Sequence, residues 1–357
     1  MKTISLCMIV KNEEAILDRC LSSIKGIVDE IIIVDTGSND NTKNIACKYT
    51  DKVFDFEWVQ DFSKARNYSF SNATKDYIIW LDADDVILEE DYIKLENLKK
   101  DMDGTVDIYM LNYNYSQDEF GNCTIMQKRE RILKREKNYQ WISPIHEVIV
   151  PTGNIQDVDI TVTHKKEEIK DLERNLKIFK KMVEEGKELD DRQEYAYAKE
   201  LYYLHYYEEA KERYENFIEK YKDNYKNIIS YMNSAVIELV ECYKILNESE
   251  EKRLELLFFM LKNTKPIPEC CCKIGDIFLD KKDYKTAIFW YEMAKDVGEE
   301  FEGENMKYND FVPNICIGVC YYWLNDMESA NKYNELAGKL KPNDEVYLKN
   351  KEIYNTK

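Results

Sequence analysis

The sequence predicts an α/β domain built on a mostly parallel sheet, followed by an all-α domain of helical repeats. Short apolar runs rich in β-branched residues alternate with amphipathic segments in the first 85 residues, which is typical of a sheet covered by helices on both faces. From about residue 166 these runs vanish, and Tyr, Leu, Ala, Glu and Lys recur at helical spacing. Small residues also return at similar offsets there, which indicates stacked helix pairs.

The first part divides into strands and helices in alternation. Apolar runs predict strands at Leu6–Val10, Ile31–Val34, Val53–Phe56 and Tyr77–Leu81. Apolar residues at helical spacing predict helices at Glu13–Ser23, Lys43–Tyr49 and Ser63–Asn72. Ligands of such sheets bind at the carboxyl ends of the strands. We therefore expect one site at one rim of the sheet, formed by the polar clusters that directly follow three strands, at 11–14, 35–40 and 82–85.

The second part contains three units with the spacing of a tetratricopeptide-type helix pair. Their small and aromatic residues are Ala198, Leu201, Ala210 and Tyr214 in one unit, Gly275, Phe278, Ala287, Tyr291 and Ala294 in the next, and Gly318, Tyr321, Ala330, Ala337 and Pro342 in the last. The stretch 228–262 fits only weakly, and about nine residues are expected as an insertion near 298–308. We expect an α/β domain at 1–165, a repeat domain at 166–345 and a tail at 346–357.

Composition excludes several classes of protein. The formal charge of −18, from 69 acidic and 51 basic residues, argues against a nucleic-acid or anionic-membrane binder. No apolar stretch reaches the ~18 residues that a membrane span needs. The ten cysteines lack the paired spacing of a metal site, and the apolar N-terminal run ends at Lys11 without a cleavage site for a signal peptide. These observations predict reduced thiols and a cytoplasmic protein.

Two sets of acidic residues at the predicted rim could carry chemistry. The run Asp82–Asp85 follows a strand directly, and its two carboxylates one residue apart, Asp82 and Asp84, suit a divalent cation with oxygen ligands. The alternative is that Asp85 begins a helix. Asp35 could hydrogen-bond a ribose or a base, with Gly37 allowing close backbone approach, or it could simply cap the following turn. The sequence has no GxGxxG motif or phosphate-binding P-loop.

Four motifs carry a resemblance to a known family. They are Leu6–Glu14 (LCMIVKNEE), Ile32–Thr42 (IIVDTGSNDNT), Trp58–Asn67 (WVQDFSKARN) and Trp80–Asp85 (WLDADD). In this order and spacing, they resemble the family 2 glycosyltransferases. More narrowly, they resemble the bacterial subgroup in which a GT-A catalytic domain, a Rossmann-like mostly parallel sheet, precedes tetratricopeptide-like helices. The motifs cover about residues 4–165, and the repeat pattern extends over the remainder.

The resemblance implies a nucleotide-diphosphate sugar as donor. In similar enzymes the positions that match Val10, Lys11, Asn12, Glu13 and Asp35 hold the nucleoside. Asp82, Ala83 and Asp84 match the DxD motif, which meets ribose and metal, and Arg66 matches an arginine near the donor, where its charge could offset phosphate. Arg131 lies in a basic run where the family often has an arginine. His164 matches a late histidine, and we expect it to bind Mn²⁺ or Mg²⁺ together with Asp84.

The resemblance also implies direct displacement with inversion at the sugar. Such a transfer needs a base for the acceptor proton, and the family pattern has a His-Glu pair that matches His146 and Glu147. Glu147 is the leading candidate for the base, and His146 is the alternative.

These observations lead to two hypotheses for the function of the whole chain. In the first, the enzyme uses UDP-linked glucose or N-acetylglucosamine, and its repeats hold a peptide or protein acceptor with a Ser, Thr or Cys side chain. In the second, the α/β domain is inactive and the chain is a scaffold. A polysaccharide or lipid-linked acceptor, a nucleotidyltransferase activity and a homodimer formed through the repeats remain open alternatives.

Overall fold

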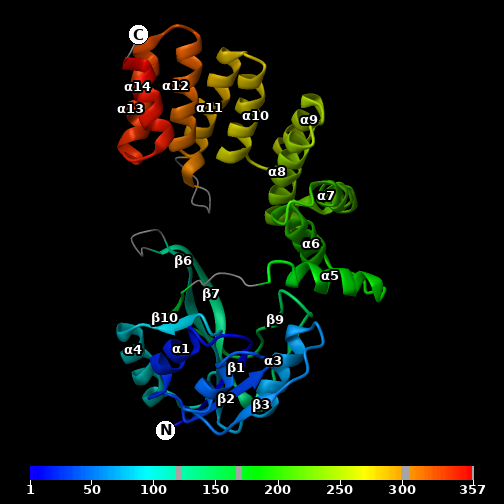
Figure 1. Cartoon of the computed structure of the whole chain (residues 1–357), viewed down its shortest axis with the longest axis vertical. Helices are drawn as coiled ribbons and strands as arrows, with labels where there is room; N and C mark the ends of the chain where they lie inside the picture. The colour runs from blue at the N-terminus through cyan, green and yellow to red at the C-terminus, as the bar shows by residue number, and fades with distance from the viewer. Residues whose placement is uncertain (118–122, 166–170, 299–305, 356–357) are drawn as a thin grey trace. The chain divides into compact units, whose positions relative to one another are not determined.

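The computed structural model describes residues 1–117, 123–165, 171–298 and 306–355. Contacts within the chain divide it into two compact units, Met1–Gly186 and Lys187–Lys357, and Figure 1 labels many of their elements. Helix α5 (Arg174–Glu184) belongs to the first unit, although the boundary expected from the sequence precedes it. Where the functional α/β domain ends stays a prediction.

The first unit is built on a mixed sheet in which the described strands have the order β3-β2-β1-β4-β7-β6-β10-β5. Strands β1, β2, β3 and β4 are mutually parallel, whereas β7 is antiparallel to β4 and β6, and β5 is antiparallel to β10. The strands are β1 (Ile4–Val10), β2 (Glu30–Asp35), β3 (Val53–Asp55), β4 (Tyr77–Trp80), β5 (Asp85–Ile87), β6 (Ile108–Gln117), β7 (Cys123–Lys134) and β10 (Ile155–His164). The predicted α/β class and its four parallel strands are confirmed, and the strands after β4 extend the sheet further than we expected.

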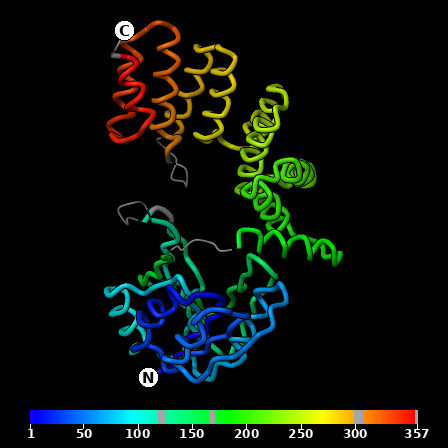
Figure 2. Tube along the Cα trace, viewed as in Figure 1, coloured from blue at the N-terminus to red at the C-terminus, as the bar shows by residue number. Residues whose placement is uncertain are grey.

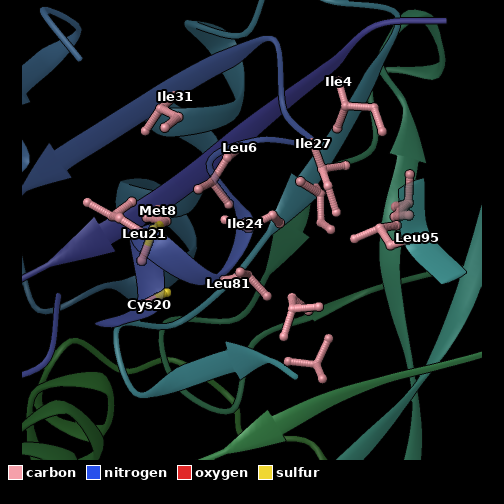
Figure 3. Close-up of a cluster of buried hydrophobic side chains, with 14 of the residues drawn as sticks. Ile4, Leu6, Met8, Cys20, Leu21, Ile24, Ile27, Ile31, Leu81 and Leu95 are labelled. Carbon is pink, nitrogen blue, oxygen red and sulfur yellow. The ribbon is translucent and has the colours of Figure 1, made fainter. Parts of the chain in front are cut away.

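Helices cover both faces of this sheet. On one face, β1 packs against α1 (Leu17–Ile24), α2 (Thr42–Ala46) and α4 (Glu89–Asp101). Figure 3 shows Leu6 and Met8 of β1 near Leu21 and Ile24 of α1. On the other face lie α3 (Phe62–Ser71) and a small hairpin of β8 (Trp141–Ile142) and β9 (Val148–Ile149). Burial on both faces explains why β1 and β2 are almost continuously apolar.

The second unit consists of antiparallel helix pairs, which Figure 2 traces as successive hairpins. The pairs are α6 (Asp191–Tyr203) with α7 (Tyr207–Tyr221), α8 (Ile229–Ile245) with α9 (Glu250–Asn263), α10 (Pro268–Asp280) with α11 (Tyr284–Gly298), and α12 (Phe311–Trp323) with α13 (Met327–Leu340). The three predicted units are confirmed, and the weakly matching stretch also forms a pair. Residues 299–305, where the insertion is expected, lie outside the described residues.

Small residues set the spacing within these pairs. A Cβ atom added at Gly275 would lie 2.8 Å from the Tyr291 ring, so only glycine lets α10 approach α11 this closely. Most of the segment expected as a tail forms helix α14 (Glu345–Asn355), which buries Tyr347 and Tyr354. Over the residues that the structure describes, no helix has the length and apolarity required to cross a membrane.

Candidate active site

The first two polar clusters lie together at the carboxyl ends of β1 and β2. The Asn12 backbone N–H donates to Ser38 Oγ at 2.9 Å, and the Asn39 N–H donates to Asn12 Oδ1 at 2.8 Å. The third cluster follows β4, which pairs in parallel with β1 and therefore ends at the same rim. The expected convergence on one rim of the sheet is confirmed.

Asp35 is fully buried at this rim. Its Oδ1 accepts hydrogen bonds from the N–H groups of Gly37 at 2.9 Å and Ser38 at 2.8 Å. Its Oδ2 is also buried and has no hydrogen-bond partner among the described residues. A buried acceptor left without a donor costs about 1–3 kcal/mol, so this oxygen favours a ligand that brings a donor. Gly37, with φ of +102°, has no atom within 4 Å of the place where a Cβ would lie, which leaves open space beside the carboxyl.

Asp84, Asp85 and His164 form an acidic cluster at the other side of the rim. Each offers one ligand atom, and these atoms lie within 4.8 Å of one another. His164 Nδ1 is 3.4 Å from Asp84 Oδ1 and 3.6 Å from Asp85 Oδ1. Asp85 faces His164 in the β5–β10 pair, so strand pairing itself brings them together. The interpretation of Asp85 as a helix start is wrong, because α4 begins only at Glu89.

The chemistry of this cluster fits a divalent cation. Within the described part of the chain, Asp85 Oδ1 is buried without a hydrogen-bond partner, and two carboxylates with one imidazole are a donor set that suits Mn²⁺ or Mg²⁺. The Asp84 and Asp85 carboxylates raise the pKa of His164 to about 9. A metal ion that binds the imidazole at neutral pH would therefore displace a proton.

Arg131 lies behind the cluster in a β-bulge. Tyr109 pairs with Ile132 and Met110 pairs with Glu130, so Arg131 is the extra residue that the bulge redirects. Its Nη1 lies 3.0 Å from Asp85 Oδ2, and neither side chain has any exposed surface. The donor contact expected of Arg131 stays a prediction, since its side chain is fully buried and pairs with Asp85.

Arg66, from α3, joins two acidic side chains that are far apart in the sequence. Its Nη2 is 2.8 Å from Asp82 Oδ1, and its Nε is 2.6 Å from Glu147 Oε1. The guanidinium lies 5.3 Å from the Trp80 ring and 4.9 Å from the Trp141 ring, a cation–π arrangement that holds it in place. Burial opposes ionisation of Asp82, but the charges of Arg66 and of the more distant Arg131 outweigh it and lower the pKa of that carboxyl.

Glu147 and His146 end the loop between β8 and β9. The Glu147 side chain is largely buried against Arg66, whereas His146 is exposed and its ring lies 5.9 Å from that of Phe179 in α5. His146 has φ of +50° and Ser143 has φ of +85°, conformations that are uncommon for residues other than glycine. The loop therefore depends on contacts with its surroundings to keep its shape.

Comparison with known families decides the class of this domain. Residues 5–161 match the family model described as "Glycosyl transferase family 2". These residues are a family 2 glycosyltransferase domain.

Curated relatives of this glycosyltransferase domain match over short stretches. A TPR repeat-containing protein of Synechococcus elongatus is 45% identical over 97 residues, which is 27% of this chain and 24% of that protein. The SPbeta prophage-derived glycosyltransferase SunS of Bacillus subtilis is 36% identical over 100 residues, 28% of this chain and 24% of that protein. The chain thus aligns with about a quarter of the length of these two relatives.

Solved structures show a weaker similarity, over about half of the chain. Glucosyl-3-phosphoglycerate synthase from Mycobacterium tuberculosis, in complex with Mn²⁺ and uridine-diphosphate-glucose, has a TM-score of 0.36 and 16% sequence identity. The alignment covers 53% of this chain and 81% of that chain.

The glycosyltransferase domain places the predicted site residues in three groups. The β1–β2 rim carries Lys11, Asn12, Glu13, Asp35 and Gly37, the bridge consists of Arg66, Asp82 and Glu147, and the acidic cluster includes Asp84 and His164. Val10 and Ala83 are only 3% and 6% exposed. Their side chains belong to the core, so only their backbone groups could contact a donor.

Two parts of the site were not among the predicted residues. Asp85 completes the acidic cluster, and the WLDADD motif already offered it as a third carboxylate. Tyr113 lies in β6, with its hydroxyl 3.2 Å from His164 Nδ1, and the exposed Tyr115 stacks on the same imidazole at 5.5 Å between ring centroids. No motif signals these tyrosines, because a long strand pair, β6 with β10, brings them to His164.

Proposed function

We propose that the chain is a metal-dependent glycosyltransferase that moves a sugar from a nucleotide-diphosphate sugar to a side chain of a peptide or protein. The observation that carries this proposal is the bridge of Asp82, Arg66 and Glu147. The bridge puts a carboxylate suited to general-base catalysis next to the motif that, by family resemblance, meets the donor. The family 2 domain supports sugar transfer as the reaction class.

Each group of residues has a distinct role in this proposal. The buried Oδ2 of Asp35 accepts a hydrogen bond from the nucleoside, and Gly37 leaves room for the nucleoside. Asp84, Asp85 and His164 would hold Mn²⁺ or Mg²⁺, which when bound supplies positive charge against the leaving diphosphate. The positive charge of Arg66 also faces the region where negative charge develops.

Glu147 takes the acceptor proton. In the proposed displacement, the acceptor oxygen or sulfur attacks the anomeric carbon while its proton passes to the Glu147 carboxylate, and the nucleoside diphosphate leaves from the opposite side. This geometry inverts the anomeric centre. Since Arg66 Nε binds Oε1, the second carboxylate oxygen is the one that would receive the proton.

A peptide or protein acceptor is favoured by the second unit. Stacked helix pairs present extended surfaces suited to peptide segments, and exposed aromatic side chains such as Phe289 and Trp323 provide apolar contact area on them. The Synechococcus relative is itself named for TPR repeats. We propose a Ser, Thr or Cys side chain as the acceptor and UDP-linked glucose or N-acetylglucosamine as the donor.

We expect a uridine nucleotide to stabilise the protein only when metal is present. The measurement is a thermal-shift panel of UDP, GDP, CMP and dTDP, each with and without Mn²⁺ or Mg²⁺. A ligand that binds only the native state adds about 2.7 kcal/mol of stability at a hundredfold excess over Kd. If no nucleotide shifts the melting temperature under any of these conditions, the donor site is not as proposed and the scaffold interpretation gains support.

We expect Glu147→Gln to lower the hydrolysis rate of a UDP-sugar, with water as acceptor, by about 10²–10⁴-fold, because the amide cannot take a proton. UDP binding should stay close to the wild-type value, since the change lies on the acceptor side. The matched control is Glu90→Gln, at an exposed position on α4, which should retain full activity. A Glu147→Gln enzyme with the wild-type rate would remove Glu147 as the base and leave His146 as the candidate.

A further inference from the structure

The loop between β8 and β9, which carries the proposed base Glu147, has a backbone conformation that its sequence does not favour. Ser143 and His146 both have positive φ angles, +85° and +50°, and neither is a glycine, for which such angles carry little steric cost. Glu147 directly follows His146, so the backbone conformation there sets the direction of its side chain. Contacts outside the loop must therefore maintain its geometry.

Helix α3 contacts this loop at three places. At the middle of the loop, Pro144 O accepts a hydrogen bond at 2.8 Å from the Phe62 N–H, one of the first-turn donors without a partner inside the helix. At the end of the loop, Glu147 binds Arg66 Nε. Where the loop starts, the backbone of Trp141 makes two hydrogen bonds with the Asn67 side chain.

The Asn67–Trp141 pair is reciprocal. The Trp141 N–H donates to Asn67 Oδ1 at 2.8 Å, and Asn67 Nδ2 donates to Trp141 O at 2.9 Å. A side-chain amide offers an acceptor and donors at once, whereas a carboxylate offers acceptors only and an alanine offers neither. Asn67 therefore fixes both the position and the orientation of the peptide at which the loop starts.

This pair also acts on the neighbouring arginine. Two indole rings lie beside the Arg66 guanidinium, and the centroid of the Trp141 ring is 4.9 Å from Arg66 Cζ. The centroids of the Trp141 and Trp80 rings are 4.8 Å apart. A shift of the Trp141 backbone would move the indole ring that packs against the Arg66 guanidinium. Contacts thus run without interruption from the Asn67 amide through Trp141 and Arg66 to the Glu147 carboxylate.

We propose that Asn67 is a positioning residue of the transfer reaction, which holds the loop 141–147 so that Glu147 meets the acceptor. This inference rests on the proposed function. Within the described residues, the Asn67 side chain bonds to the Trp141 backbone and not to the Asp35 rim or the Asp84–His164 cluster. Its loss should therefore affect turnover and leave donor binding unchanged.

The test compares Asn67→Asp and Asn67→Ala with the wild-type full-length chain. The substrates are UDP-glucose and UDP-N-acetylglucosamine with Mn²⁺ and with water as acceptor, and UDP affinity is measured by calorimetry. We expect kcat to fall at least tenfold in both variants, with the UDP dissociation constant within twofold of wild type. Hydrogen exchange of the peptide spanning 138–150 should become faster in both.

Asn72→Ala is the matched control. Asn72 directly follows the same helix, and its side-chain amide donates to Tyr68 O at 2.8 Å, within that helix. The kcat of this variant and the hydrogen exchange of 138–150 should therefore stay at wild-type values. If Asn67→Ala does not fold, Asn67→Asp, which is nearly isosteric, decides the result. An unchanged kcat, or equal losses in kcat and UDP affinity, overturns the inference.

The outcomes separate this inference from the proposed function. If the wild type hydrolyses a UDP-sugar and Asn67→Asp does so equally fast, only the positioning role is wrong. If the wild type neither binds UDP nor hydrolyses either UDP-sugar, the proposed function fails and the positioning role falls with it. Faster exchange of 138–150 at unchanged kcat would show a structural contact without a role in turnover.

Discussion

Asp84→Asn should abolish metal-dependent UDP binding while the fold stays intact. The substitution removes a negatively charged oxygen ligand from the cluster with Asp85 and His164, and we expect Mn²⁺ affinity to fall at least about a hundredfold. The Asp84 side chain is 30% exposed. Its backbone carbonyl, which accepts from the Lys165 N–H at 2.7 Å, is unaffected, so the folded state should persist.

Calorimetric titration with Mn²⁺, followed by the thermal-shift measurement with UDP, compares Asp84→Asn with the wild type. Asp101→Asn is the control, because that carboxylate is exposed at the end of α4 and away from the cluster; it should bind Mn²⁺ like the wild type. Equal Mn²⁺ affinity in Asp84→Asn and wild type would contradict the assignment of Asp84 as a ligand.

Arg131→Leu should destabilise the first unit by about 3–5 kcal/mol, the usual cost of removing one partner from a buried ion pair. The substitution leaves the Asp85 carboxylate, which has no exposed surface, without its neutralising charge. It also removes the hydrogen bond from Arg131 Nη1 to Trp80 O at 3.2 Å. Urea unfolding followed by tryptophan fluorescence measures the change, since three of the five tryptophans lie in this unit.

Two further variants test the cause of this loss. Arg131→Leu combined with Asp85→Asn removes both charges and should recover part of the lost stability, because no uncompensated buried charge remains. Lys128→Leu changes an exposed cation in the same strand and should alter stability by less than about 0.5 kcal/mol. A loss below about 1 kcal/mol in Arg131→Leu would contradict the buried pair.

The strands and the rim of the sheet could be predicted because their signals are local. A parallel strand buried on both faces is a continuous apolar run, and a polar cluster directly after it must lie at its carboxyl end. The repeats could also be predicted from the sequence, since small residues such as Gly275 and Ala287 mark close helix contacts at fixed spacing. The family resemblance then supplied the candidate roles of these residues.

The pairings across the site could not be predicted in the same way. Arg131 lies in a run of charged residues that would ordinarily face solvent, and only the bulge in β7 and the position of Asp85 explain its burial. Asp85 was open to interpretation as a helix start because its partner in β10 is distant in the sequence. The link from Arg66 to Glu147 likewise depends on tertiary packing of α3 against the β8–β9 loop.

The sheet's last strand has a consequence for the order in which the domain is assembled. In the described sheet, β5 lies at the edge and its neighbour is β10, so Asp85 and His164 meet only after the chain through residue 164 has closed onto it. Contacts between such distant segments form late in folding, because the intervening chain must first be ordered. A cation held there would connect the edge strand β5 to its inner neighbour β10, so metal binding and docking of β5 against β10 would be thermodynamically linked.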